Sequence, residues 1–90
     1  MKIKTGFVLR ELLGEHIVTG EGLERVNFNK IISLNESAAW LWKQAQQMGD
    51  FTTDVLAARL SEEFEVSTDQ AKADVTELVA QWQSVDVVEQ

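Results

Sequence analysis

Apolar residues follow a strand-like spacing in the first third of this chain and a helix-like spacing in the rest. Residues 7–13 and 16–19 are rich in apolar side chains, and Gly14-Glu15 between them offers a turn, so this stretch predicts a β-hairpin. After a second break at Gly20-Glu21-Gly22, residues 26–34 predict a third strand, with the clearest pattern over residues 30–34. The tail at residues 85–89 is also compatible with extended structure that lies back on the body.

From residue 35 onward, apolar side chains recur at i, i+3, i+4 and i+7, which places them on one face of a helix. Three such stripes are present, and each predicts one helix. Their members are Ala38, Leu41, Trp42 and Ala45; Val55, Leu56, Leu60 and Phe64; and Ala71, Val75, Leu78, Val79 and Trp82.

Polar residues that favour helix starts stand directly before each stripe. Ser33 and Glu36 have capping-box spacing, and Asn35 is a second candidate N-cap for the first helix. The corresponding candidates for the next two helices are Thr52 or Thr53, and Ser67 with Gln70 three residues later. The third strand therefore runs straight into the first helix, which fixes the register of residues 30–34.

Three strands followed by three helices predict an α+β domain whose helices pack on one face of a small antiparallel sheet. Ninety residues with 44% hydrophobic content suit a single domain over residues 1–90. The chain has no cysteine, which excludes disulfides and thiolate metal sites within it. No stretch is long and apolar enough for a membrane helix, and the N-terminus lacks a signal-peptide pattern, so we expect a soluble cytoplasmic protein without membrane contact.

The net charge of −7 is unevenly distributed, since residues 1–34 carry +1 and residues 35–90 carry −8. An acidic helical half repels phosphate backbones and favours a cationic or neutral partner. A winged-helix DNA-binding regulator is the alternative reading of three strands and three helices. Its recognition helix would lie at residues 67–84, where three acids, Asp69, Asp74 and Glu77, accompany only one base, Lys72. This composition argues against nucleic-acid binding.

Residue types that perform catalysis are not grouped in this sequence. His16 is the sole histidine and cannot by itself form a metal site or an acid–base relay. There is no nucleophile–base pair, glycine-rich phosphate loop or metal-ligand spacing. We therefore expect a protein that is not an enzyme and needs no cofactor.

Several separated motifs resemble one known family over about residues 7–89. They are Leu34-Asn35-Glu36-Ser37 followed by Leu41-Trp42, the Thr52-Thr53 cap, Phe64, and Asp74-Val75 followed by Leu78. On these motifs the chain resembles the coenzyme PQQ synthesis protein D family, whose fold is also called the RiPP recognition element. The resemblance implies a winged helix-turn-helix-like domain without catalytic activity. Such domains bind the leader segment of a ribosomally made precursor peptide and present it to a peptide-modifying enzyme, often a radical SAM protein, in PQQ or other modified-peptide biosynthesis.

The resemblance also implies where the leader lies: antiparallel to the third strand, in the groove between that strand and the third helix. Carried over by position, main-chain hydrogen bonds would come from Asn29, Lys30, Ile31, Ile32 and Ser33. The apolar wall would come from Val75, Leu78 and Val79, with Lys72 and Asp74 near the rim. A helix stripe serves both a core and a groove, so the pattern leaves open which of these residues face the peptide.

Trp40 stands two positions before Trp42 and therefore points about 200° away from it on a helix. If Trp42 is buried, we expect Trp40 to be largely exposed and to offer a surface for the partner enzyme. The alternative is partial burial under the N-terminal hairpin.

Overall fold

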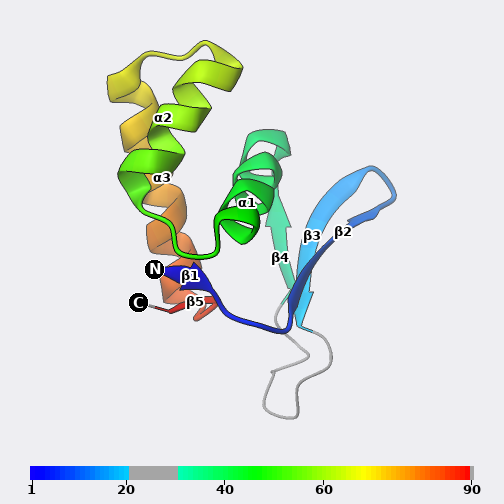
Figure 1. Cartoon of the computed structure of the whole chain (residues 1–90). Coiled ribbons are helices and arrows are strands. Elements are labelled where there is room, and N and C mark those ends of the chain that lie inside the picture. The colour runs from blue at the N-terminus through cyan, green and yellow to red at the C-terminus, as the bar shows by residue number, and fades with distance from the viewer. Residues whose placement is uncertain (21–30, 90) are drawn as a thin grey trace.

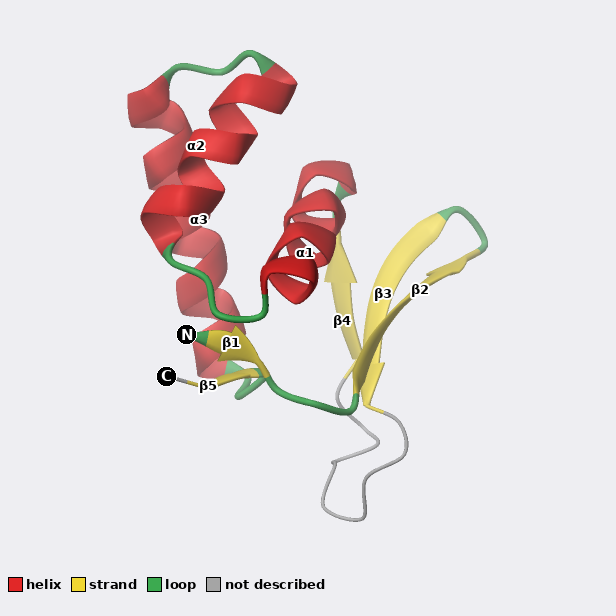
Figure 2. Cartoon of the chain, in the orientation of Figure 1, coloured by secondary structure: helices red, strands yellow, loops and turns green. Residues whose placement is uncertain are grey.

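The computed structural model describes residues 1–20 and 31–89 (Figure 1). Its elements are β1 (Lys2–Ile3), β2 (Phe7–Leu12), β3 (Glu15–Gly20), β4 (Ile31–Leu34), α1 (Glu36–Met48), α2 (Thr53–Phe64), α3 (Thr68–Ser84) and β5 (Val88–Glu89). A three-stranded antiparallel sheet of order β2-β3-β4 precedes the three helices, which confirms the predicted α+β class. In Figure 2, α1 lies between this sheet and the antiparallel pair of α2 and α3.

β2 and β3 form the predicted hairpin, with a register that runs from Phe7↔Gly20 to Leu12↔Glu15. The turn consists of Leu13 and Gly14, one residue earlier than the predicted Gly14-Glu15. Both turn residues have positive φ, 53° and 81°, which is the geometry of a type I′ turn. Gly14 adopts it readily, whereas Leu13 does so against the preference of a branched apolar side chain.

β4 pairs antiparallel with β3, from His16↔Leu34 to Thr19↔Ile31. The strand predicted over residues 30–34 is thus confirmed for Ile31–Leu34. Asn29 and Lys30, which were assigned to the same strand, lie outside the described residues.

The C-terminal tail lies back on the body, as predicted, but it is a strand only at Val88–Glu89, because Val85 and Asp86 form a turn after α3. Its partner is β1, with Lys2 opposite Glu89 and Ile3 opposite Val88. The main-chain N–H of Lys4 extends this pairing by donating to the carbonyl of Val87 at 2.9 Å. The tail therefore pairs with the N-terminus and not with β4 (Figure 1).

Each helix begins at a side-chain cap. Asn35 Oδ1 accepts from the N–H of Ala38 at 2.8 Å, so Asn35 is the N-cap of α1 and the capping-box assignment to Ser33 is wrong. The reason is that β4 continues through Leu34, which places Ser33 inside the strand. Thr52 caps α2 and Ser67 caps α3, both within the predicted alternatives.

The core joins the sheet to all three helices. Val18 of β3, Leu34 of β4 and Leu56 of α2 are buried together with two tryptophans, Trp42 of α1 and Trp82 of α3. The two indole rings meet edge to face with centroids 5.2 Å apart, a favoured geometry for aromatic pairs. The apolar stripes of α1 and α3 therefore face the core as predicted, except that Leu78 of α3 is only partly buried.

The predicted stripe of α2 is only half correct. Leu56 and Leu60 are buried, but Val55 and Phe64 are 43% and 38% exposed. Val55 lies in the first turn of α2, and Phe64 is its last residue, so both lie at ends of the helix. Phe64 consequently remains accessible beside α1, where it becomes part of the site described next.

Candidate functional site

Within residues 1–20 and 31–89, the outer edge of β4 is open, since no strand pairs with it. Leu12 and Glu15 flank the two-residue turn of the hairpin and therefore form a hydrogen-bonded pair, and such pairs alternate along an antiparallel ladder. On β3, the main-chain groups of Ile17 and Thr19 accordingly bond to β2, whereas those of His16 and Val18 point toward β4.

The same alternation sets the direction of the main-chain groups of β4. Leu34 and Ile32, opposite His16 and Val18, bond to β3. The N–H and C=O groups of Ile31 and Ser33 therefore point away from the sheet. No described strand pairs with this side of β4.

The side chains of β4 also alternate. Leu34 is buried and Ile32 is half-buried against the core, whereas Ser33 is exposed. One face of β4 is thus anchored in the core. Its outer edge presents the main-chain N–H and C=O groups of Ile31 and Ser33, with which an extended chain can pair.

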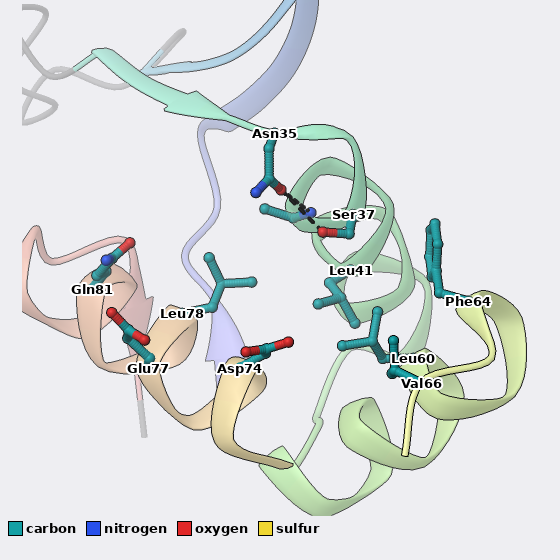
Figure 3. Close-up of a pocket in the computed structure, with 11 residues that line it drawn as sticks. Asn35, Ser37, Leu41, Leu60, Phe64, Val66, Asp74, Glu77, Leu78 and Gln81 are labelled. Carbon is teal, nitrogen blue, oxygen red and sulfur yellow. Dashed lines mark hydrogen bonds between the residues drawn. The ribbon is translucent and has the colours of Figure 1, made fainter. Parts of the chain in front are cut away.

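A groove of about 560 Å³ opens where β4 passes into α1 (Figure 3). Its lining comes from three elements: Asn35, Ser37, Ala38 and Leu41 at the start of α1; Leu60, Phe64 and Val66 at the end of α2; and Asp74, Glu77, Leu78 and Gln81 of α3. Asn35 directly follows β4, so the open strand edge and the groove are continuous in the chain. Leu78 of α3 and the buried Leu41 of α1 point toward each other across the groove (Figure 3).

Local structure holds these side chains in place. Asn35 Oδ1 accepts from the Ser37 hydroxyl at 3.1 Å in addition to its capping bond, which orders the rim at the start of α1. The C-cap residue of α2, Glu65, has a left-handed conformation, and the hydroxyl of Ser61 donates to the carbonyl of Val66 at 2.7 Å. Val66 is thereby held beside Phe64 at the end of the groove.

The family follows from a sequence comparison. The model of the family described as Coenzyme PQQ synthesis protein D (PqqD) matches residues 8–88. The chain belongs to the PqqD family. This confirms the resemblance that the motifs indicated.

A comparison with solved structures finds one match of the same fold. "TbiB1 in Complex with the TbiA(beta) Leader Peptide" superposes with a TM-score of 0.78, covering 99% of this PqqD-family chain and 95% of TbiB1, at 12% identity. Comparison with curated proteins finds no match. The TbiB1 likeness confirms the fold of this PqqD-family chain, and at this identity it extends to the fold alone.

The structure separates the α3 residues predicted for the groove into three groups: two that line it, two that are buried behind it, and Lys72, which lies away from it. Asp74 and Leu78 line the groove of this PqqD-family protein, which lies between α1, α2 and α3 and is not lined by Ile32, Ser33 or Leu34 of β4; whether they contact a peptide stays a prediction. Val75 and Val79 do not, because they are buried in the core with exposed fractions of 0% and 3%. They support the groove wall from behind and present no surface to a peptide.

Lys72 was expected at the rim and lies elsewhere. It is two residues from Asp74, about 200° around α3, so the two side chains leave the helix on opposite sides. The Lys72 ammonium lies 3.9 Å from a carboxylate oxygen of Asp54 on α2. Lys72 therefore belongs to the outer face of the α2–α3 pair.

Nine lining residues were not predicted as site residues. They are Asn35, Ser37, Ala38, Leu41, Leu60, Phe64, Val66, Glu77 and Gln81. Glu77 and Gln81 could have been found from the helical spacing around Leu78, since Asp74, Glu77, Leu78 and Gln81 fall at i, i+3, i+4 and i+7. The others depend on how α1 approaches α2, which spacing does not reveal.

Trp40 is half-buried and not largely exposed as expected. Its ring lies edge to face with that of Phe64, with centroids 5.4 Å apart. The partial burial foreseen as the alternative thus occurs against α2 and not under the N-terminal hairpin. Because Phe64 lines the groove, Trp40 packs directly behind one of its lining residues; its role toward a partner enzyme stays a prediction.

Within residues 1–20 and 31–89, no group of three or more His, Cys, Asp or Glu side chains could hold a metal ion. None of the described helices is long and apolar enough to span a membrane.

Proposed function

We propose that this PqqD-family protein binds the leader segment of a ribosomally made precursor peptide and holds it for a peptide-modifying enzyme. The observation that carries the proposal is the edge of β4, where the main-chain groups of Ile31 and Ser33 point outward and the strand leads directly into Asn35, which lines a groove of mixed apolar and acidic character. The complex of TbiB1 with the TbiA(beta) leader peptide supports it, because a protein of the same fold holds a leader.

The proposed mechanism is strand addition. Main-chain hydrogen bonds to Ile31 and Ser33 supply affinity regardless of the leader's sequence, and the groove selects among leaders through the side chains at alternate positions. The accessible apolar contacts in the groove are Leu78, Phe64 and Val66, above a buried floor of Leu41 and Leu60.

In this proposal the protein performs no chemistry of its own. Tethering the leader raises the effective concentration of the rest of the precursor at the enzyme's active site. The modifying enzyme is expected to be a radical SAM protein, and the pathway PQQ biosynthesis or that of another modified peptide. The alternative DNA-binding role has no support in α3, whose Lys72 already lies near Asp54 and whose remaining ionised side chains are acidic.

The test is a selection followed by a titration. Short random peptides displayed on phage are selected on the immobilised protein, and the tightest binder is titrated into isotope-labelled protein. We expect the amide signals of Ile31 and Ser33 to shift together with those around Leu78. Failure to recover any binder, or shifts confined to the turn at Leu13 and Gly14, would contradict strand addition at β4.

A further inference from the structure

The groove carries negative charge from Asp74 and Glu77, whose side chains are exposed. Among the described residues that line the groove, these two are the only ionisable ones. Gln70 Nε2 donates to Asp74 Oδ1 at 2.8 Å, which orients that carboxylate and leaves its second oxygen available. In the described part of the chain, neither Asp74 nor Glu77 forms a salt bridge.

The bases of the helical half do not reach the groove. The Lys72 ammonium lies 3.9 Å from Asp54, and Arg59 donates to Gln44 Oε1 at 2.6 Å. Neither base, nor Lys43, lines the groove. An occupant that brings its own positive charge would therefore meet two carboxylates that form no salt bridge within the described residues.

The acidic and apolar parts of the groove also have a defined spacing. Asp74 and Leu78 are four residues apart on one face of α3, which corresponds to about 6 Å along the helix. Side chains on one face of an extended peptide repeat every ~6.8 Å. A peptide paired with β4 could thus place an apolar side chain against Leu78 and the next side chain on the same face beside Asp74 or Glu77.

Building on the proposed function, we propose that the groove selects leaders in which a Lys or Arg stands two residues from an apolar anchor. The anchor packs against Leu78, Phe64 and Val66, and the cation lies beside Asp74 and Glu77. An acidic residue at that position would be repelled, so the two carboxylates exclude leaders with an acidic residue there as well as favour basic ones.

The first test is the composition of the selected peptides. We expect enrichment of Lys or Arg two residues from a conserved apolar position among the binders. Binders without such enrichment, or with acidic residues there, would overturn the inference.

The second test removes the two charges without changing shape. The double variant Asp74→Asn/Glu77→Gln should bind the selected basic peptide about tenfold more weakly, since two exposed ion pairs are lost. The control is Glu62→Gln/Glu63→Gln, which removes the same charge from exposed positions of α2 outside the groove. A loss in the groove variant no larger than that in the control would refute the assignment.

The two proposals fail in different ways. If the amides of Ile31 and Ser33 shift on peptide binding but neutralisation of Asp74 and Glu77 has no more effect than the control, strand addition stands and the charge preference is wrong. If the selected peptide leaves Ile31 and Ser33 unchanged, the proposed function itself is wrong.

Discussion

Proline at position 33 should block peptide pairing while leaving the protein folded. The N–H of Ser33 points away from β3, so its removal breaks no bond within the sheet, and edge strands accept proline where the N–H faces outward. Ile32 is already extended, which is the conformation preferred before a proline. The cap of α1 is provided by Asn35 and is not involved.

The expected loss of affinity follows from the bonds that Ser33 would make. In an antiparallel pair, one residue exchanges both its N–H and its C=O with the residue opposite, so Ser33 contributes two bonds to the added strand. Proline removes the first, and its ring pushes the added strand away from the second. At about 1 kcal/mol net for each bond, Ser33→Pro should weaken binding by ~2 kcal/mol, or roughly thirtyfold.

The assay is fluorescence anisotropy with the labelled selected peptide. Ser33→Ala is the matched control, because it removes the hydroxyl and keeps the N–H, and it should bind like the unchanged protein. Urea unfolding of both variants verifies that they are folded. A folded Ser33→Pro protein that binds as tightly as Ser33→Ala would refute the assignment of outward-facing groups on β4.

Three further changes test the structure around the site by urea unfolding. Asn35→Ala removes the cap of α1 and should cost about 1 kcal/mol, and an unchanged midpoint would show that the cap is not needed. Leu13→Asn should raise stability by about 1 kcal/mol because asparagine tolerates positive φ, whereas Leu12→Asn, within β2, should give no gain; equal effects would contradict the turn geometry. A double-mutant cycle of Trp40→Ala and Phe64→Ala should give a coupling energy of roughly 1 kcal/mol, and additive effects would mean that the ring contact contributes nothing.

The features that the sequence predicted correctly depend on neighbours along the chain. The hairpin, the strand that ends at Leu34 and the caps at Thr52 and Ser67 are each determined by residues only a few positions away in the sequence. Periodicity also identified the buried faces of α1 and α3, because residues that share a helical face share the same environment. The choice between Ser33 and Asn35 as a cap was settled by how far β4 pairs with β3.

The features that the sequence missed depend on which element lies opposite. Val75, Leu78 and Val79 form one apolar stripe, yet only Leu78 reaches the groove, because the start of α1 and the end of α2 leave space on its side of α3. The helical angle correctly directed Trp40 away from Trp42, but Phe64 at the end of α2 covers it there. Such contacts between distant segments are not encoded in the spacing within any one helix.

The sheet has two edges, and their main-chain groups explain why a peptide should add to β4. On β2, the alternation that directs Ile31 and Ser33 outward also directs Phe7 outward, and the carbonyl of Phe7 accepts from Gln46 Nε2 of α1 at 3.3 Å. The edge of β2 is thus partly occupied by the protein itself. β4 retains both outward-facing residues and runs directly into Asn35 at the rim of the groove. Since the C-terminal tail is already paired with β1, the described part of the chain offers no internal strand for this edge, which leaves it available for the proposed pairing with a peptide.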